Sequence, residues 1–250
     1  MAIIIGFALW GLFVGLVVGF TAIGKGLIGT PGLIVFFGIP PVTAVGSMAV
    51  AGFAMMLSGT WRHYKSGNVI LPVAFLFSIT AVPAAYLTAI YASSLNEIFP
   101  LETVIGVVII ISVALLFYRY VIVKASPREL SVERTTLVLS PVLGLVLGAL
   151  MGATSISGSI IVIAFIMLLR LPSPNAVGTT SLVSAASLLV ASVAHMQSGN
   201  VDWSVVAAMI PGVLAGAAIG ATYMDRVPRQ ALRMGILVLL LAAGIMVLLG

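Results

Sequence analysis

The sequence contains no cysteine and few charged residues. Without cysteine, the chain can form neither disulfide bonds nor thiolate metal sites nor cysteine-ligated iron–sulfur clusters. Only 7% of its residues are charged and 62% are apolar, whereas a water-soluble domain carries about 25% charged residues. Such a chain has too little polar surface to cover a soluble fold. The composition therefore predicts a protein embedded in a lipid bilayer.

The charged residues are separated by long uncharged tracts, and most of these tracts are long enough to span a membrane. A helix needs about 18–20 apolar residues to cross about 30 Å of hydrocarbon. Closed β-barrels are the other spanning structure, but their alternating pattern of about 10 residues per strand is absent from the sequence. The predicted fold class is an all-α integral membrane protein without an extramembrane domain.

The net charge of +5 comes from basic residues that are dispersed over loops and not gathered in a stripe. A nucleic-acid surface is therefore disfavoured, and the basic residues are better interpreted as membrane-orientation signals. No cluster of metal ligands is present, so neither a metal nor a cofactor is predicted. The N-terminus lacks a basic segment and a small-residue cleavage site, so residues 3–23 are interpreted as a retained helix and not as a signal peptide.

The chain contains an internal repeat with an offset of 132 residues. Residues 26–69 align with 158–201 without a gap, and about 14 of the 44 positions are identical, including His63 with His195 and a Ser-Gly-Asn-Val motif. Apolar composition alone would not align proline, histidine and a loop motif together, so two related halves are predicted. We place the first transmembrane repeat at 1–118, a linker at 119–134 and the second transmembrane repeat at 135–250.

Each half follows the same predicted plan. An apolar helix runs into a break of small residues, and a short apolar piece follows that is too short to span comfortably. Three further helices complete the half. The predicted segments are 3–23, 27–38, 42–62, 70–92 and 101–121 in the first half, and 136–153, 160–170, 175–196, 203–224 and 231–249 in the second.

The basic residues indicate the topology. If the first helix and the short piece of each half form a re-entrant hairpin, ten lysine and arginine residues fall on one face and none on the other. If they form one crossing, the same residues divide six against four. Cytoplasmic loops collect lysine and arginine, so the hairpin is favoured, with a cytoplasmic linker and both termini outside the cell (plasma or inner) membrane. Three net crossings per half then invert the second half relative to the first, as in many secondary transporters.

The two small-residue breaks, which we call the tips, are the strongest candidates for a binding site. A helix break at membrane depth is tolerated only where it is buried in protein or lines a cavity, and helix N-termini attract anions. Glycine lets the backbone approach a ligand, and serine hydroxyls donate hydrogen bonds. The alternative is that these small residues only let helices pack closely. The candidate substrate-binding residues at the tips are Gly24, Lys25, Gly26, Ser155, Ser157, Gly158 and Ser159.

Lys25 is the one charged residue inside an otherwise uncharged membrane tract. A lysine at mid-membrane costs about 2.5–3.5 kcal/mol on insertion scales, so we expect an anionic partner for it. The alternative is that its side chain extends to the membrane interface. Its repeat equivalent is Ser157, so the charge is not a requirement of both halves.

Two further pairs recur at equivalent positions of the repeat. His63 and His195 end equivalent helices, where histidine stabilises the helix dipole or serves in gating or proton coupling. Ser47 and Thr179 each follow a Val-Gly step at the start of a helix. They either cap that helix or contact the substrate.

At these residues the sequence resembles the sulfite exporter TauE/SafE family, also known as the 4-toluene sulfonate uptake permease family. That family has a twofold repeat in which a glycine-rich break, a short apolar piece and a Gly-x-Pro-x-x-Ala-Val-Gly-Thr-Ser-like stretch follow one another. The corresponding stretches here are 38–47 and 171–181. The break departs from the usual three consecutive glycines, because Lys25 replaces one in the first copy and serines flank Gly158 in the second. The resemblance implies transport of sulfite, sulfonates or related small organic anions, driven by an ion gradient.

We therefore predict a secondary transporter, not an enzyme, that moves a small anion by alternating access between inverted repeats. Its expected partners are the anionic substrate, the bilayer and a coupling ion, either H⁺ or Na⁺; no nucleic acid is expected, and the oligomeric state is open. An anion channel with the same tips is the nearest alternative. A membrane-embedded hydrolase would need a nucleophile beside a base and an oxyanion site, but no acid is available to orient His195. A purely structural subunit would tolerate substitutions at the tips.

Overall fold

The computed structural model describes residues 2–21, 25–119, 132–223 and 229–249, without the side chains of residues 21, 25, 58 and 229–233. The described part is helical and contains no strand. The first half contains α1 (Ala2–Thr21), α2 (Lys25–Phe37), α3 (Pro41–Lys65), α4 (Leu71–Ile90), α5 (Ala92–Ile98) and α6 (Leu101–Phe117). The second half contains α7 (Arg134–Thr154), α8 (Ser159–Met167), α9 (Ser173–Gln197), α10 (Trp203–Tyr223) and α11 (Arg229–Leu249).

Six described helices are long and apolar enough to cross a membrane, namely α1, α3, α4, α7, α9 and α10. A seventh span results if α5 and α6, which meet at a bend of 88°, are counted together. Shorter apolar helices are formed by residues 26–37 and 234–249. The predicted all-α membrane fold is therefore confirmed. The short helix α5 was not predicted, because its residues 92–98 separate two apolar tracts and carry polar side chains.

The recurring Ser-Gly-Asn motif ends the two longest helices in the same way. Gly67 and Gly199 both have φ of +69°, a conformation that glycine adopts without steric cost. The N–H of Asn68 donates to the His63 carbonyl at 3.1 Å, and the N–H of Asn200 donates to the equivalent His195 carbonyl at 2.8 Å. This is the Schellman arrangement, which satisfies the last carbonyls of a helix. The motif therefore recurs because it stops α3 and α9.

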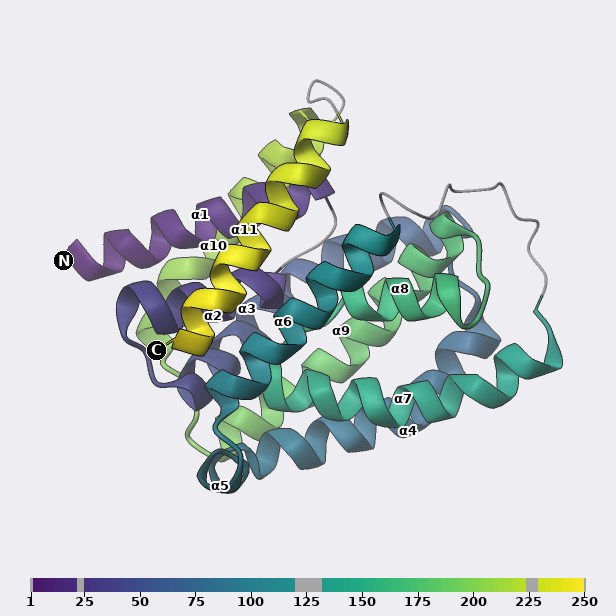
Figure 1. The fold of residues 1–250 in the computed structure, drawn as a ribbon, viewed down its shortest axis with the longest axis horizontal. Helices are drawn as coiled ribbons and strands as arrows, with labels where there is room; N and C mark the ends of the chain where they lie inside the picture. The colour runs from purple at the N-terminus through teal and green to yellow at the C-terminus, as the bar shows by residue number, and fades with distance from the viewer. Residues whose placement is uncertain (1, 22–24, 120–131, 224–228, 250) are drawn as a thin grey trace.

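The two halves interlock and do not lie side by side as separate units. Neighbouring helices form the series α1, α10, α3, α9, α4 and α7, in which first-half and second-half helices alternate. Figure 1 shows α4 and α7 together along one edge of the molecule, with α1 and α10 toward the opposite side. Exchanging each helix for its repeat equivalent gives the same series in reverse. Helices α6 and α11, which are also repeat equivalents, pack on each other.

Glycine rows let the outer helix pairs approach closely. Gly11, Gly15 and Gly19 of α1 lie against the backbone of α10, and their contacts with Met209, Val213 and Ala217 rise in register, so the two helices are parallel. Small residues at four-residue spacing are typical of close helix packing in membranes. A row of three glycines in α7 lies in the same way against the carbonyls of α4.

The central pair, α3 and α9, runs antiparallel. Gly46 near the start of α3 packs on Asn200 after the end of α9, and Gly178 near the start of α9 packs on Asn68 after the end of α3. Near the second of these contacts, Thr60 Oγ1 donates to the carbonyl of Ser181 at 3.0 Å. Two repeat-equivalent helices thus point in opposite directions.

The first two helices of each half form a hairpin. In the first half the rings of Phe7 and Phe37 lie 4.9 Å apart between centroids, so the start of α1 lies beside the end of α2. In the second half Thr136 Oγ1 donates to the carbonyl of Leu169 at 3.4 Å, so the start of α7 lies beside the segment that follows α8. In both halves the end of the short apolar piece thus lies beside the start of the long helix that precedes it.

Candidate functional site

The two tips lie against each other inside the protein. The backbone of Gly26, at the start of α2, packs on the backbone of Ser155 and Ile156 so closely that a Cβ atom would collide with it. Four residues further along α2, the hydroxyls of Thr30 and Ser155 share a hydrogen bond of 2.8 Å. Both of these side chains are buried. The described parts of the two breaks are therefore in direct contact.

The second tip reverses the chain through two left-handed residues. Ser155 has φ of +54° and Gly158 has φ of +76°, and a serine in this region is uncommon. The Thr154 hydroxyl donates to the Leu150 carbonyl at 2.6 Å and accepts from the Ile156 N–H at 3.2 Å. These bonds hold the turn that separates α7 from α8, so that α8 begins in the interior of the protein.

Two serine hydroxyls at the second tip have no hydrogen-bond partner. Ser157 Oγ and Ser159 Oγ are buried and unpaired, although an unsatisfied buried polar group costs about 1–3 kcal/mol. Ser159 is also the first residue of α8, where the first N–H groups lack intrahelical partners and the helix dipole is positive. Two free hydroxyl donors at a buried helix N-terminus form a site suited to an anion.

The first tip adds a second helix N-terminus. Helix α2 begins at Lys25, so a cationic residue stands at the positive end of a helix, where its charge is unfavourable. Gly24 and the side chain of Lys25 lie outside the described residues, as do residues 22 and 23. The described backbone nevertheless places the first turn of α2 in contact with the second tip.

Ser47 and Thr179 connect the two halves. The N–H of Asp202 donates to Ser47 Oγ at 3.0 Å, and the N–H of Ile70 donates to Thr179 Oγ1 at 3.0 Å. The two bonds are equivalent under the repeat, because each joins the start of α3 or α9 to the start of a helix in the other half. Both hydroxyl oxygens thus accept backbone bonds, and their contact with a substrate stays a prediction.

The two repeat-equivalent histidines have different surroundings. His195 is fully buried, and its Nε2 lies 3.0 Å from the carbonyl oxygen of Gly152, close before the second tip. Because a carbonyl can only accept, Nε2 carries the proton of the neutral ring and Nδ1 is the free acceptor. Nδ1 is buried without a partner. His63, in contrast, is partly exposed.

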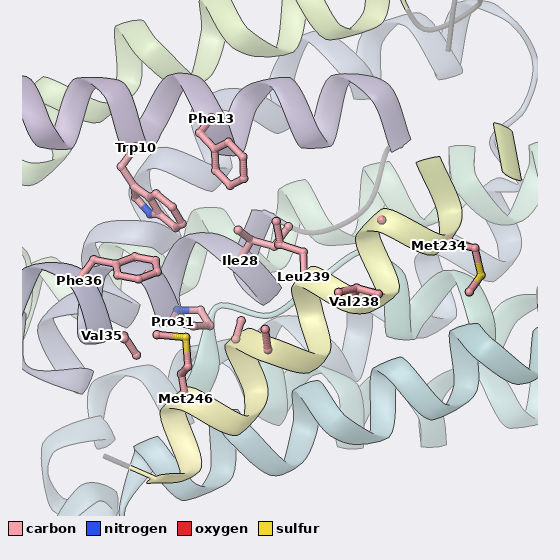
Figure 2. Close-up of a pocket in the computed structure, with 14 residues that line it drawn as sticks. Trp10, Phe13, Ile28, Pro31, Val35, Phe36, Met234, Val238, Leu239 and Met246 are labelled. Atoms are coloured by element: carbon pink, nitrogen blue, oxygen red, sulfur yellow. The ribbon is translucent and has the colours of Figure 1, made fainter. Parts of the chain in front are cut away.

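A pocket of about 660 Å³ lies between α1, α2 and α11. Figure 2 shows Trp10, Phe13 and Phe36 on one side of this pocket and Val238, Leu239 and Met246 on the other. The Trp10 N–H is already donated to the Gly29 carbonyl. The remaining lining consists of apolar side chains and glycine, which suits apolar contact and offers no side-chain donor to an anion. Within the described residues, no three His, Cys, Asp or Glu side chains group as a metal site.

The sequence profile of the family described as "Sulfite exporter TauE/SafE" matches residues 7–247. The chain belongs to this family. It is 26% identical over 239 residues to the "Probable membrane transporter protein YdhB" of Bacillus subtilis (strain 168), which covers 94% of this chain and 96% of the relative. It is 28% identical over 252 residues to the "Probable membrane transporter protein YjnA" of the same organism, covering 95% and 96%.

A third TauE/SafE-like relative, a "Probable membrane transporter protein" of Xylella fastidiosa (strain 9a5c), is 24% identical over 221 residues, or 86% of this chain and 83% of the relative. No solved structure matches the chain. Family membership and these relatives identify a multi-pass membrane transporter and not an enzyme.

Sequence reasoning about this TauE/SafE transporter missed two parts of the site. Thr30 was overlooked because its repeat equivalent is the apolar Val162, so the repeat gave no signal there. A lone threonine one turn after the break, on an otherwise apolar helix, was the available signal. The unpaired hydroxyls of Thr180, Ser184 and Ser187 on α9 were also missed, because helix packing alone explains small residues in a membrane helix.

Proposed function

We propose that this transporter carries a small anion, namely sulfite, a sulfonate or a related organosulfur or organic anion, and that the two tips bind it. The unpaired, buried hydroxyls of Ser157 and Ser159 at the N-terminus of α8 carry the proposal. Three oxygen atoms of a sulfite or sulfonate group can accept from such hydroxyls and from the first N–H groups of the helix. The description of the family as a sulfite exporter supports a sulfur oxyanion as the substrate class.

The electrostatics of the tips support an anion in particular. Helices α2 and α8 both begin at the contact between the tips, so two positive helix ends and the Lys25 position come together there. Without a ligand these like charges repel. An anion between them offsets the repulsion and compensates a lysine in a membrane tract.

Alternating access between inverted repeats is the mechanism that we infer. The antiparallel α3 and α9, and the equivalent bonds to Ser47 and Thr179, support two halves related by an axis in the membrane plane. In this mechanism the hairpins hold one anion, and movement of the surrounding helices exposes the binding site to each side of the membrane in turn. The distribution of the basic residues supports a cytoplasmic linker and both termini on the outer side of the cell (plasma or inner) membrane.

Counterflow in proteoliposomes tests this function. Vesicles loaded with unlabelled sulfite and diluted into labelled sulfite should accumulate label transiently above equilibrium, and excess methanesulfonate should compete more strongly than acetate. The double variant Ser157→Ala, Ser159→Ala should raise the sulfite concentration needed for half-maximal transport by about tenfold or more. Each lost charge-assisted hydrogen bond is worth about 1.5–3 kcal/mol.

Ser140→Ala is the matched control. Ser140 is buried in α7, but its hydroxyl is satisfied by the Thr136 carbonyl at 2.6 Å, so its removal should leave half-saturation unchanged. Equal transport by the tip double variant and the wild type would remove the tips from the proposal. Single-channel currents without counterflow would replace the carrier by an anion channel.

A further inference from the structure

A polar stripe runs along one face of α9 in the interior of the protein. We define the stripe as Thr180, Ser184, Ser187 and His195, whose exposed fractions are 3%, 0%, 0% and 0%. Steps of four, three and eight residues keep these side chains on one face of a helix. The three hydroxyls and His195 Nδ1 have no hydrogen-bond partner. Four unpaired polar atoms on one buried helix face are unusual for a packed protein interior.

Other serines on the same helix show that this is not a general property of α9. Ser181 Oγ donates to the Val177 carbonyl at 3.1 Å, and Ser192 Oγ donates to the Leu188 carbonyl at 2.6 Å. Such a bond to the carbonyl four residues earlier is the usual way in which a helical serine satisfies its hydroxyl. The stripe hydroxyls do not make it. They have no hydrogen-bond partner among the described residues, so water can bind them.

The stripe is not part of the fold that the two halves share. The equivalents of Thr180, Ser184 and Ser187 in α3 are Met48, Gly52 and Met55. The first half therefore forms the same long helix without these hydroxyls. A feature that the architecture does not require, and that leaves buried polar groups unpaired, indicates a role beyond packing.

The stripe runs beside the second tip. Helices α8 and α9 pack on each other and are joined by residues 168–172 alone. At a rise of about 1.5 Å per residue, Ser159 lies about 12 Å from the end of α8, and Ser184 lies about 16 Å from the start of α9. The two residues therefore lie at similar distances from the connection between these helices. At the far end of the stripe, His195 is bonded to Gly152, close before the same tip.

We propose that His195 accepts the coupling proton and that the stripe holds the water through which this proton reaches and leaves it. This rests on the proposed function and names its coupling ion. The lone pair of Nδ1 forms an N–H bond with a proton delivered by water, while Nε2–H stays bonded to the Gly152 carbonyl. The ring becomes an imidazolium of charge +1. On the other side of the membrane Nδ1 returns the proton to water, so no proton is gained or lost over the cycle.

The proton and the anion favour each other's binding. A buried, unpaired imidazolium is unfavourable, but an anion at the adjacent second tip supplies the opposite charge. By linkage, the proton then raises the affinity for the anion by the same factor as the anion raises the affinity for the proton, commonly about 5–150-fold. The two therefore move in the same direction. Sodium is disfavoured at this position because a hard cation prefers oxygen ligands to an imidazole nitrogen.

Ionisable groups on the described elements around His195 are engaged elsewhere or distant along the chain. On α4, Tyr86 OH donates to Gln197 Oε1. After α9, the Asp202 carboxylate accepts from Ser204. Helix α8 carries no ionisable residue. Those of α3 and α7 stand at the ends away from Gly46 and Gly152: Arg62, His63, Tyr64 and Lys65 on α3, and Arg134 on α7.

The test is sulfite uptake into proteoliposomes with and without an inward proton gradient, after subtraction of uptake by protein-free vesicles. In the wild type the gradient should raise initial uptake at least fivefold, and an equal sodium gradient should not. In His195→Gln, whose amide can still donate to the Gly152 carbonyl but cannot take up a proton, the ratio of the two rates should fall to about 1. Ser184→Ala, Ser187→Ala should lower this ratio as well.

His63→Gln and Ser192→Ala are the matched controls, and both should keep the wild-type ratio. Circular dichroism and thermal unfolding establish whether each variant is folded. If His195→Gln does not fold, the result for the double variant Ser184→Ala, Ser187→Ala decides between the outcomes. Two outcomes would overturn the inference while the proposed function stands. One is wild-type counterflow on which the proton gradient has no effect, and the other is a full response to the gradient in both stripe variants. Absence of counterflow in the wild type would instead remove the proposed function.

Discussion

The hydroxyls of Thr30 and Ser155 lie 2.8 Å apart although 125 residues separate them in the sequence. One belongs to the short helix of the first hairpin and the other to the break of the second. This bond and the packing of Gly26 on the same break make the two tips one continuous unit. A substrate bound at the proposed site would contact both halves of the transporter at once, as the proposed alternating access requires.

Removing the Thr30 hydroxyl should destabilise the protein. Thr30→Val keeps the side-chain shape but leaves the buried Ser155 hydroxyl without its partner, at a cost of about 1–3 kcal/mol. We expect a lower midpoint of thermal unfolding in detergent. Thr222→Val is the control, because Thr222 is exposed and bonds only within its own helix. Equal midpoints for the two variants would show that the bond between the tips does not stabilise the fold.

Removing the Ser157 hydroxyl should have the opposite effect on the ligand-free protein. Ser157 Oγ is buried and unpaired, so Ser157→Ala removes an unsatisfied group and should leave the unfolding midpoint equal to that of the wild type or higher. The upward shift of the midpoint on adding sulfite should shrink, since the ligand loses a donor. A lower midpoint without sulfite, together with an unchanged shift, would contradict a binding role for Ser157.

The close contact of α7 with α4 predicts a strong effect at Gly152. A Cβ atom there would collide with the Ala85 carbonyl and with Thr88 Oγ1, so Gly152→Ala should destabilise the protein by about 1–3 kcal/mol. Gly59→Ala is the control in α3, because no atom lies within 4 Å of the added carbon. Helix propensity alone should stabilise that variant by up to about 1 kcal/mol. Chemical unfolding monitored by circular dichroism measures both.

The equivalent bonds to Ser47 and Thr179 predict that substitutions at the two residues lower the free energy of unfolding additively. Ser47→Ala and Thr179→Val each leave one backbone N–H without its acceptor, that of Asp202 or that of Ile70. Each should cost about 1–3 kcal/mol, and the double variant should lose the sum, because distant sites without shared partners behave independently. A double variant that loses much less than the sum would show that the two bonds are coupled.

The hydrogen bonds of Asp202, which lies outside the spans, predict that the stability of the protein depends on pH. The Ser204 hydroxyl, and with it the Ser204 and Val205 N–H groups at the start of α10, lower the pKa of the Asp202 carboxyl. A lowered pKa in the folded state contributes stability above the unfolded value of about 3.9, and this contribution disappears as the pH falls through the folded pKa. Asp202→Asn should therefore flatten the decline of the unfolding midpoint below about pH 4. Identical pH profiles for Asp202→Asn and the wild type would contradict this role.

The asymmetry between the halves marks the limit of reasoning from the repeat. Equivalence under the repeat led to His63 and His195 being treated alike, yet His195 is fully buried and bonded to Gly152, whereas His63 is partly exposed. The same reasoning gave no signal for Thr30, whose equivalent is Val162. Repeats preserve the backbone plan, while the side chains that differ between copies depend on neighbours that the alignment does not contain.

The sequence by itself determined that the chain lies in a membrane, that it consists of two related halves and where each half is interrupted. Those conclusions depend on composition, on the lengths of apolar tracts and on local breaks, all of which are properties of contiguous residues. Tertiary structure decided which side chains meet across more than a hundred residues. Only the packing of the helices shows that Thr30 reaches Ser155, that Ser47 and Thr179 accept bonds from the opposite half, and that the hydroxyls at the second tip stay unpaired. Burial and hydrogen bonding depend on the faces that helices present to each other, and hydrophobicity does not specify those faces when nearly every face of a helix is apolar.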